Sequence, residues 1–142
     1  MANVFIETAL RLLGSRKPTS LMLLRDISQV TVLLDADAPD CAEAELAVRK
    51  YFASKGIRLI IRPVWARKPI RVHRDTQVLL SLVPHNSWRL EYVLRRSRAA
   101  FKIGRFQLGD GVLDLVVSDP VGSSYPQTEV FARMMEILEG LK

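Results

Sequence analysis

The sequence has few of the residues that build disulfides, metal centres and membrane spans. A single cysteine, Cys41, excludes an internal disulfide and is typical of intracellular proteins. One cysteine and two histidines, His73 and His85, leave no zinc-ligand spacing. No apolar run comes near the length of about 20 residues that a membrane-spanning helix needs. Residues 1–13 lack the basic start and small-residue cleavage site of a signal peptide. We therefore expect a cytoplasmic protein without a membrane span.

Acidic residues are scarce in the middle of the chain. The segment from Arg49 to Arg105 holds fifteen of the 21 lysines and arginines but only two acids, Asp75 and Glu91. This segment carries a formal charge of +13, and the other residues carry −7, which together give the net charge of +6. Clustered cations raise the local potential whatever the net charge is. The sequence thus predicts an anionic partner such as nucleic acid, acidic lipid or a ribosomal surface.

The 142 residues are enough for one domain with a buried core. Asn3 to Leu13 has apolar residues at helical spacing and ends at Gly14, which predicts an amphipathic N-terminal helix. This helix and the connector after it make up residues 1–29, and the helix is a candidate contact for a homodimer. Residues 30–142 are expected to form a single Rossmann-like α/β domain.

Apolar runs alternate with helical patterns along that domain, which predicts a three-layer sandwich around a mostly parallel, five-stranded sheet. Strands are expected at 30–34, 57–64, 78–83, 100–103 and 113–118, and helices at 41–55, 88–98 and 127–141. Arg58 and Arg62 fall on one face of the second strand, so that strand should lie at an edge or be half solvated.

Local signals mark the ends of these elements. Asp40 and Glu43 have the spacing of a capping box before the first helix of the domain, and Lys55 with Gly56 predicts its end. Between the strands at 100–103 and 113–118 there is no room for a crossover helix. Residues 109–111 read Gly-Asp-Gly, which is typical of a tight turn, so these two strands are expected to form a hairpin with one antiparallel strand.

Residues 77–82, the helix that follows them and residues 97–105 resemble a family of small, functionally uncharacterised bacterial α/β proteins. That family has a strand ending in Asp and a segment like Ala-x-Phe-Lys-Val-Gly, which residues 34–35 and 99–104 match. The same block is more distantly similar to the N-terminal half of heptosyltransferase-like glycosyltransferases. Those enzymes hold a nucleotide-sugar mainly in a second domain and carry a Gly-Asp pair after the first strand, where this chain has Leu34-Asp35-Ala36-Asp37.

Asp35 and Asp37 follow the first strand, where ligands bind in open α/β sheets. They are the candidate catalytic residues, as a general base or a magnesium site, if the chain is a glycosyltransferase-related enzyme or ligand-binding domain. The same carboxylates could instead favour the positive end of the next helix. The loop has no glycine to bring backbone N–H groups to a phosphate, so we expect no nucleotide cofactor. Because the cysteine and histidines have no zinc-ligand spacing, the leading interpretation includes no bound metal.

The basic segment is the stronger candidate site. Arginine outnumbers lysine there, which suits bidentate contacts to phosphate, and two aromatic residues one helical turn apart could stack on bases. The proposed nucleic-acid-binding residues are Arg67, Lys68, Arg71, Arg74, Trp88, Arg89, Tyr92, Arg95, Arg96, Arg98, Lys102 and Arg105. The simpler alternative is a solvated face in which Glu91 and Arg95 form an i,i+4 pair.

Two hypotheses of function follow from the sequence. The first is a non-catalytic domain that binds RNA or a ribonucleoprotein surface, with a ribosome as one such surface, through the loop at 67–74 and the helix at 88–98. The alternative is the glycosyltransferase-related domain that works at Asp35 and Asp37. The first hypothesis depends on whether folding gathers the arginines onto one exterior face.

Overall fold

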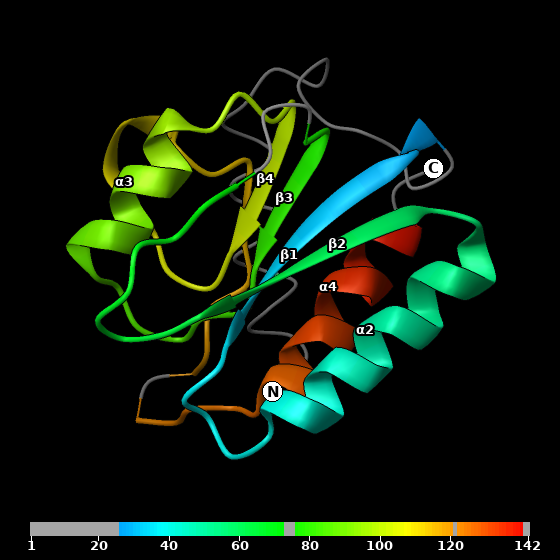
Figure 1. The fold of residues 1–142 in the computed structure, drawn as a ribbon, viewed down its shortest axis with the longest axis horizontal. Helices are drawn as coiled ribbons and strands as arrows, with labels where there is room; N and C mark the ends of the chain where they lie inside the picture. The colour runs from blue at the N-terminus through cyan, green and yellow to red at the C-terminus, as the bar shows by residue number, and fades with distance from the viewer. Residues whose placement is uncertain (1–25, 73–75, 121, 141–142) are drawn as a thin grey trace.

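The computed structural model describes residues 26–72, 76–120 and 122–140 (Figure 1). They form one sheet of the strands β1 (Gln29–Asp35), β2 (Arg58–Val64), β3 (Val78–Ser81), β4 (Phe101–Gly104) and β5 (Leu115–Val116). The α-helices of this part of the chain are α2 (Cys41–Lys55), α3 (Trp88–Arg96) and α4 (Gln127–Gly140). The α/β class expected from the alternating pattern is confirmed.

All five strands are parallel and lie in the order β2-β1-β3-β4-β5. β1 and β3 lie inside the sheet and are buried on both faces, which explains their nearly continuous apolar sequences. β2 pairs with β1 from Arg58 opposite Gln29 to Val64 opposite Asp35. It is an edge strand, as its two arginines predicted, and Arg58 and Arg62 are exposed.

Helices cover both faces of the sheet, so the described residues form three layers (Figure 1). Neighbouring residues of one strand point to opposite faces, and β1 therefore contributes to two separate cores. Val32 and Leu34 join the first core, under α2 and α4, whereas Leu33 joins the second core, under α3. The second core is made of Leu33, Val64, Leu79, Val83, Leu90, Leu94, Leu108, Leu113 and Val116.

The helix predicted over 41–55 is α2, with the same bounds. Gly56 ends it in the left-handed conformation, at φ 69°, and its N–H bonds to the carbonyl oxygen of Ala53. The capping box expected at its start is wrong, because the side chain of Asp40 makes no capping bond to α2. Asp40 instead accepts from the backbone N–H of Gln127, the first residue of α4, at 2.6 Å.

The expected hairpin between β4 and β5 is also wrong, because these strands pair in parallel, with Ile103 opposite Leu115. The connection contains only the short 3-10 helix η3 (Gly109–Gly111). Leu108 and Leu113 belong to the second core, and Phe106 packs against it. The connection thus buries its own apolar side chains on the α3 side of the sheet, and no long helix is needed for the crossover.

The N-terminal helix expected over 3–13 and the connector at 15–20 lie outside the described residues. The homodimer expected through that helix therefore stays a prediction. Among the helices of the described residues, none is both long enough and apolar enough to cross a lipid bilayer.

Replacement of Leu94 by alanine tests the second core. Leu94 is fully buried there, so we expect Leu94→Ala to lower the free energy of unfolding by about 2–5 kcal/mol. The matched control is Leu46→Ala on α2, where the leucine is 70% exposed and the change should stay within about 0.5 kcal/mol. Urea denaturation followed by circular dichroism measures both. Equal effects of the two substitutions would contradict this description of α3.

Candidate functional site

The basic segment after β2 is fastened to the α3 side of the sheet. Ile70 and Val72 pack against the second core, whose helical cover is α3 (Figure 1). At the start of the segment, the backbone N–H of Ala66 donates to Oδ2 of Asp37 at 2.9 Å. These contacts hold the intervening cations on the same side of the molecule as α3. Arg67, Lys68 and Arg71 are all exposed there.

The amphipathic pattern of α3 determines which of its side chains face outward. Leu90 and Leu94, one turn apart, are buried in the second core. The hydroxyl of Ser87 accepts from the backbone N–H of Leu90 at 3.2 Å and caps the helix. The opposite side of the helix therefore projects into solvent, and it carries Trp88, which is 72% exposed, and Tyr92, which is 55% exposed.

Each of three exposed aromatic rings on this side has a cation over it. Lys68 Nζ lies 5.5 Å from the ring centroid of Trp65, the guanidinium of Arg89 lies 4.5 Å from Trp88, and that of Arg96 lies 5.3 Å from Tyr92. Such contacts contribute about 0.5–1 kcal/mol each at exposed sites. They hold the rings in place while leaving them accessible.

Glu91 is the one acid in the described residues 65–72 and 86–98. Its Oε1 accepts from Nδ2 of Asn86 at 3.0 Å, and its Oε2 accepts from Nε of Arg95 at 3.0 Å. These two bonds hold the pKa of Glu91 below its ordinary value, and the bond from Asn86 has the larger effect. The carboxylate is therefore ionised at neutral pH. An open hollow of about 560 Å³ lies here, lined by Asn86, Ser87, Trp88, Glu91, Tyr92 and Arg95.

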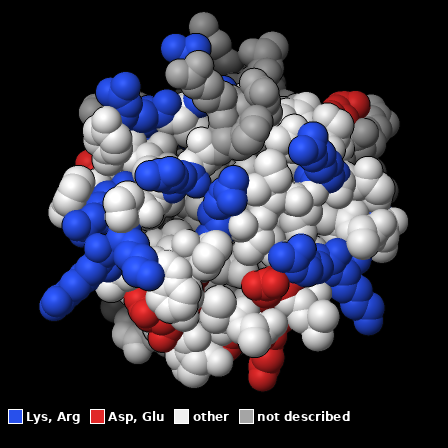
Figure 2. Space-filling model, viewed as in Figure 1, with Lys and Arg blue, Asp and Glu red and all other residues white. Residues whose placement is uncertain are grey.

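The two faces of the sheet differ in charge. Residues 65–72 and 86–98 hold seven cations and one acid, whereas α2 and α4 together hold four cations and five acids. In Figure 2, lysines and arginines are densest on the left, where α3 lies in Figure 1, with some acids below them. Others lie across the centre and beside acids at the lower right, near α2. We call the first surface the α3 face and define it by Trp65, Arg67, Lys68, Arg71, Trp88, Arg89, Tyr92, Arg95, Arg96 and Arg98.

Three of the sequence-predicted cations are not placed on the α3 face. Arg74 lies outside the described residues. Lys102 is half-buried, and its Nζ donates to the carbonyl oxygen of Leu94 at 2.7 Å, near the end of α3. Burial lowers the pKa of Lys102, and the charge of Asp114 acts in the opposite direction. The third, Arg105, is only 4% exposed.

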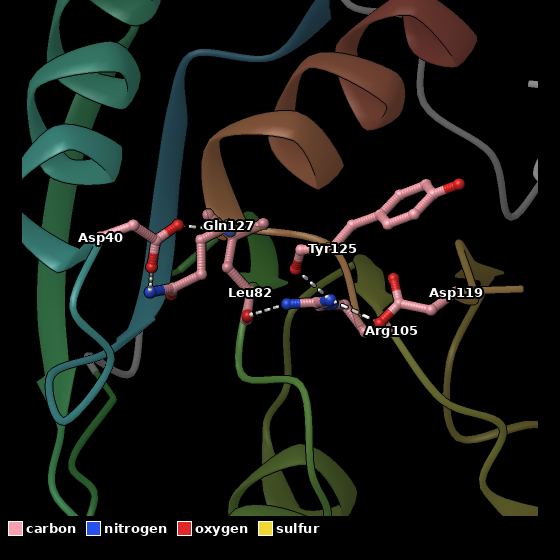
Figure 3. Close-up of polar contacts among 6 residues, drawn as sticks. All are labelled: Asp40, Leu82, Arg105, Asp119, Tyr125 and Gln127. Carbon is pink, nitrogen blue, oxygen red and sulfur yellow. Dashed lines mark hydrogen bonds and ion pairs between the residues drawn. The ribbon is translucent and has the colours of Figure 1, made fainter. Parts of the chain in front are cut away.

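Arg105 bridges the chain beyond the carboxyl ends of the strands (Figure 3). Its Nη1 donates to the carbonyl oxygen of Leu82 at 3.1 Å, and its Nη2 donates to that of Tyr125 at 2.9 Å. Nη2 also pairs with Oδ2 of Asp119 at 2.7 Å. The guanidinium therefore holds three segments together inside the protein, and we leave it out of the α3 face.

Gln127 makes a second bridge at the same end of the sheet (Figure 3). Its Oε1 accepts from the backbone N–H of Asp35 at 2.8 Å, and its Nε2 donates to the Asp35 carbonyl oxygen at 3.2 Å. Nε2 also donates to Oδ1 of Asp40 at 3.2 Å. The carboxyl end of β1 is thereby tied to the start of α4, across 92 positions of sequence.

Asp35 and Asp37, the alternative catalytic pair, accept backbone hydrogen bonds in this region. Asp35 is buried, and its Oδ1 accepts from the backbone N–H of Asp37 at 3.1 Å. Asp37 is exposed and fastens the segment after β2 through Ala66. Among the described residues, His, Cys, Asp and Glu side chains form no group of three or more that could hold a metal ion.

Four contributors to the α3 face and its hollow were not among the predicted site residues, namely Trp65, Asn86, Ser87 and Glu91. Trp65 lies two residues before Arg67, the first cation of the loop, and this proximity was a usable signal. Asn86 directly precedes the capping residue Ser87, which places its amide within reach of the first turn of α3.

Comparisons with models of known protein families, with curated proteins and with solved structures found no match. The structure itself shows an α/β fold with a five-stranded parallel sheet.

The buried ion pair of Arg105 is expected to stabilise the fold. Because Asp119→Ala would leave a buried guanidinium without its counter-charge, we expect a loss of about 3–5 kcal/mol in the free energy of unfolding. Glu136→Ala is the control, since it removes an exposed ion pair with Arg133 and should cost less than about 1 kcal/mol. Chemical denaturation compares them, and a small effect of Asp119→Ala would show that Arg105 is not held as described.

Proposed function

We propose that this domain binds single-stranded RNA, free or displayed on a ribonucleoprotein, through the α3 face and without catalysing a reaction. The observation that carries the proposal is the grouping of exposed arginines with exposed, cation-supported aromatic rings on one side of the molecule. The alternative site at Asp35 and Asp37 has no such observation in its favour.

The charges of the α3 face suit a phosphate backbone. Arginine presents N–H donors in a planar fork that matches phosphate oxygens, and it stays protonated at any physiological pH. Two separate segments share one side of the sheet: one carries the loop cations Arg67 and Arg71, and the other carries Arg96 at the end of α3 and Arg98 just after it. A strand lying across both segments would meet several cations in succession.

The aromatic residues favour a single strand over a duplex. Trp88 and Tyr92 project from α3 and are one helical turn apart. Their rings could stack only on bases that are not already stacked within a duplex. Stacking depends little on base identity, whereas phosphate contacts give affinity. The groups on this face are donors, cations and rings, which suit binding more than proton or group transfer.

The salt dependence of binding tests the electrostatic part. If about five phosphates are neutralised, the logarithm of affinity should fall with the logarithm of salt concentration at a slope near −3.5. Replacing Arg67, Arg96 and Arg98 together by glutamine should weaken binding at least about tenfold and make the slope shallower by about 2. Fluorescence anisotropy with a labelled 12-nucleotide RNA measures both quantities.

The matched control replaces Arg49, Lys50 and Arg133 by glutamine, because it removes the same charge from α2 and α4. This variant should bind nearly as the parent protein does. Equal losses in the two triple variants would mean that only net charge matters, and salt-insensitive binding or no binding would reject the proposal.

The aromatic part has its own test. Base stacking contributes about 1–3 kcal/mol per base, so Trp88→Ala or Tyr92→Ala should weaken RNA binding roughly fivefold to a hundredfold. Both side chains are exposed, so the unfolding midpoint should hardly change. Leu46→Ala, which removes an equally exposed apolar side chain from α2, should leave binding unchanged. Unaltered affinity in both aromatic variants would exclude stacking on α3.

A further inference from the structure

Glu91 has an unusual position for an acid, because it stands among the cations and rings that would receive RNA. It follows Trp88 by three residues and precedes Tyr92, so its side chain lies beside the exposed rings in the hollow at the start of α3. An acid there weakens the attraction of the surface for phosphate. Phosphate binding therefore does not explain why an acid lies in the hollow.

The carboxylate of Glu91 is held in place and keeps acceptor capacity. Asn86 and Arg95 each donate to a different oxygen of it, both at 3.0 Å. A carboxylate has about four acceptor positions on its two oxygens, so these bonds leave about two for a ligand. Bonding to both neighbours favours the ionised form, which accepts hydrogen bonds and donates none.

The ring of Trp88 is likewise held by a neighbour and open to a ligand. The guanidinium of Arg89 lies 4.5 Å from its centroid, yet 72% of the residue remains exposed. A base stacked on this ring would have its edge beside the lining residues of the hollow, among them Glu91 and Asn86. Unpaired bases are commonly read in this manner, by stacking on a ring and by hydrogen bonds along the Watson–Crick edge.

We infer that the hollow accepts an unpaired guanine base, stacked on Trp88 and recognised by the carboxylate of Glu91. Of the four RNA bases, guanine alone presents two adjacent donors on its Watson–Crick edge, the N1–H and the exocyclic amino group. Two adjacent donors match two carboxylate oxygens. Guanine O6, next to them, suits the NH₂ group of Asn86, which carries two hydrogens and uses one for Glu91. The inference rests on the proposed function and gives the same site a base preference.

The test compares three uridine-rich, 12-nucleotide RNAs that are alike except at four isolated positions. These positions hold guanine, inosine or adenine, and inosine lacks only the exocyclic amino group of guanine. The parent protein should bind the guanine strand about tenfold or more tightly than the other two, as expected for loss of a bidentate contact. Fluorescence anisotropy at one fixed salt concentration measures the three affinities.

Glu91→Gln is the diagnostic variant, because it keeps the length of the side chain and replaces one acceptor oxygen by a donor. We expect it to bind all three strands alike and to bind the adenine strand at least as well as the parent protein does. A purely structural role of Glu91 at the start of α3 would instead weaken binding to every strand by the same factor. Glu136→Gln on α4, also an exposed glutamate in an ion pair, should keep the guanine preference.

The outcomes separate this inference from the proposed function. If the parent protein binds all three strands equally, or if Glu91→Gln keeps the preference, the guanine site is wrong while RNA binding stands. If no strand binds, the proposed function fails and the guanine site fails with it.

Discussion

Burial of apolar side chains on one face of the sheet determines which charges this protein presents. Leu90 and Leu94 fix the rotation of α3, and Ile70 and Val72 fix the segment after β2 on the same second core. Because these residues face inward, the arginines and aromatic residues between them must face outward. Two stretches separated by β3 are thereby displayed together, although nothing in their own chemistry draws them to each other.

The same fold commits other polar and charged side chains to contacts within the protein. Arg105 and Gln127 link segments beyond the carboxyl ends of the strands, where ligands of open α/β sheets usually bind. Lys102 bonds to the last turn of α3, and Asp37 fastens the segment that carries the loop cations. Charges near the sheet thus hold the fold together, and the proposal places binding on the outer side of α3.

Local chemistry in the sequence predicted the elements whose causes are local. The bounds of α2, the glycine that ends it and the edge position of β2 followed from periodicity, turn residues and charge. The hairpin prediction failed because Gly109-Asp110-Gly111 suggested a reversal, whereas burial of Leu108 and Leu113 decided the direction of β5. The sequence shows that Arg105 is charged but not that it is buried. The bridge made by Gln127 joins residues 92 positions apart, so the local sequence around neither residue predicts it.

The central claim is that the α3 face, and no other surface, receives RNA. The most direct measurement is a titration of the ¹⁵N-labelled protein with a 12-nucleotide single-stranded RNA, followed by amide chemical shifts. The account predicts that the shifts change along residues 65–72 and 86–98, while α2 and α4 stay unperturbed. Changes centred on α2 and α4, or on the loop from Asp35 to Asp40, would contradict it.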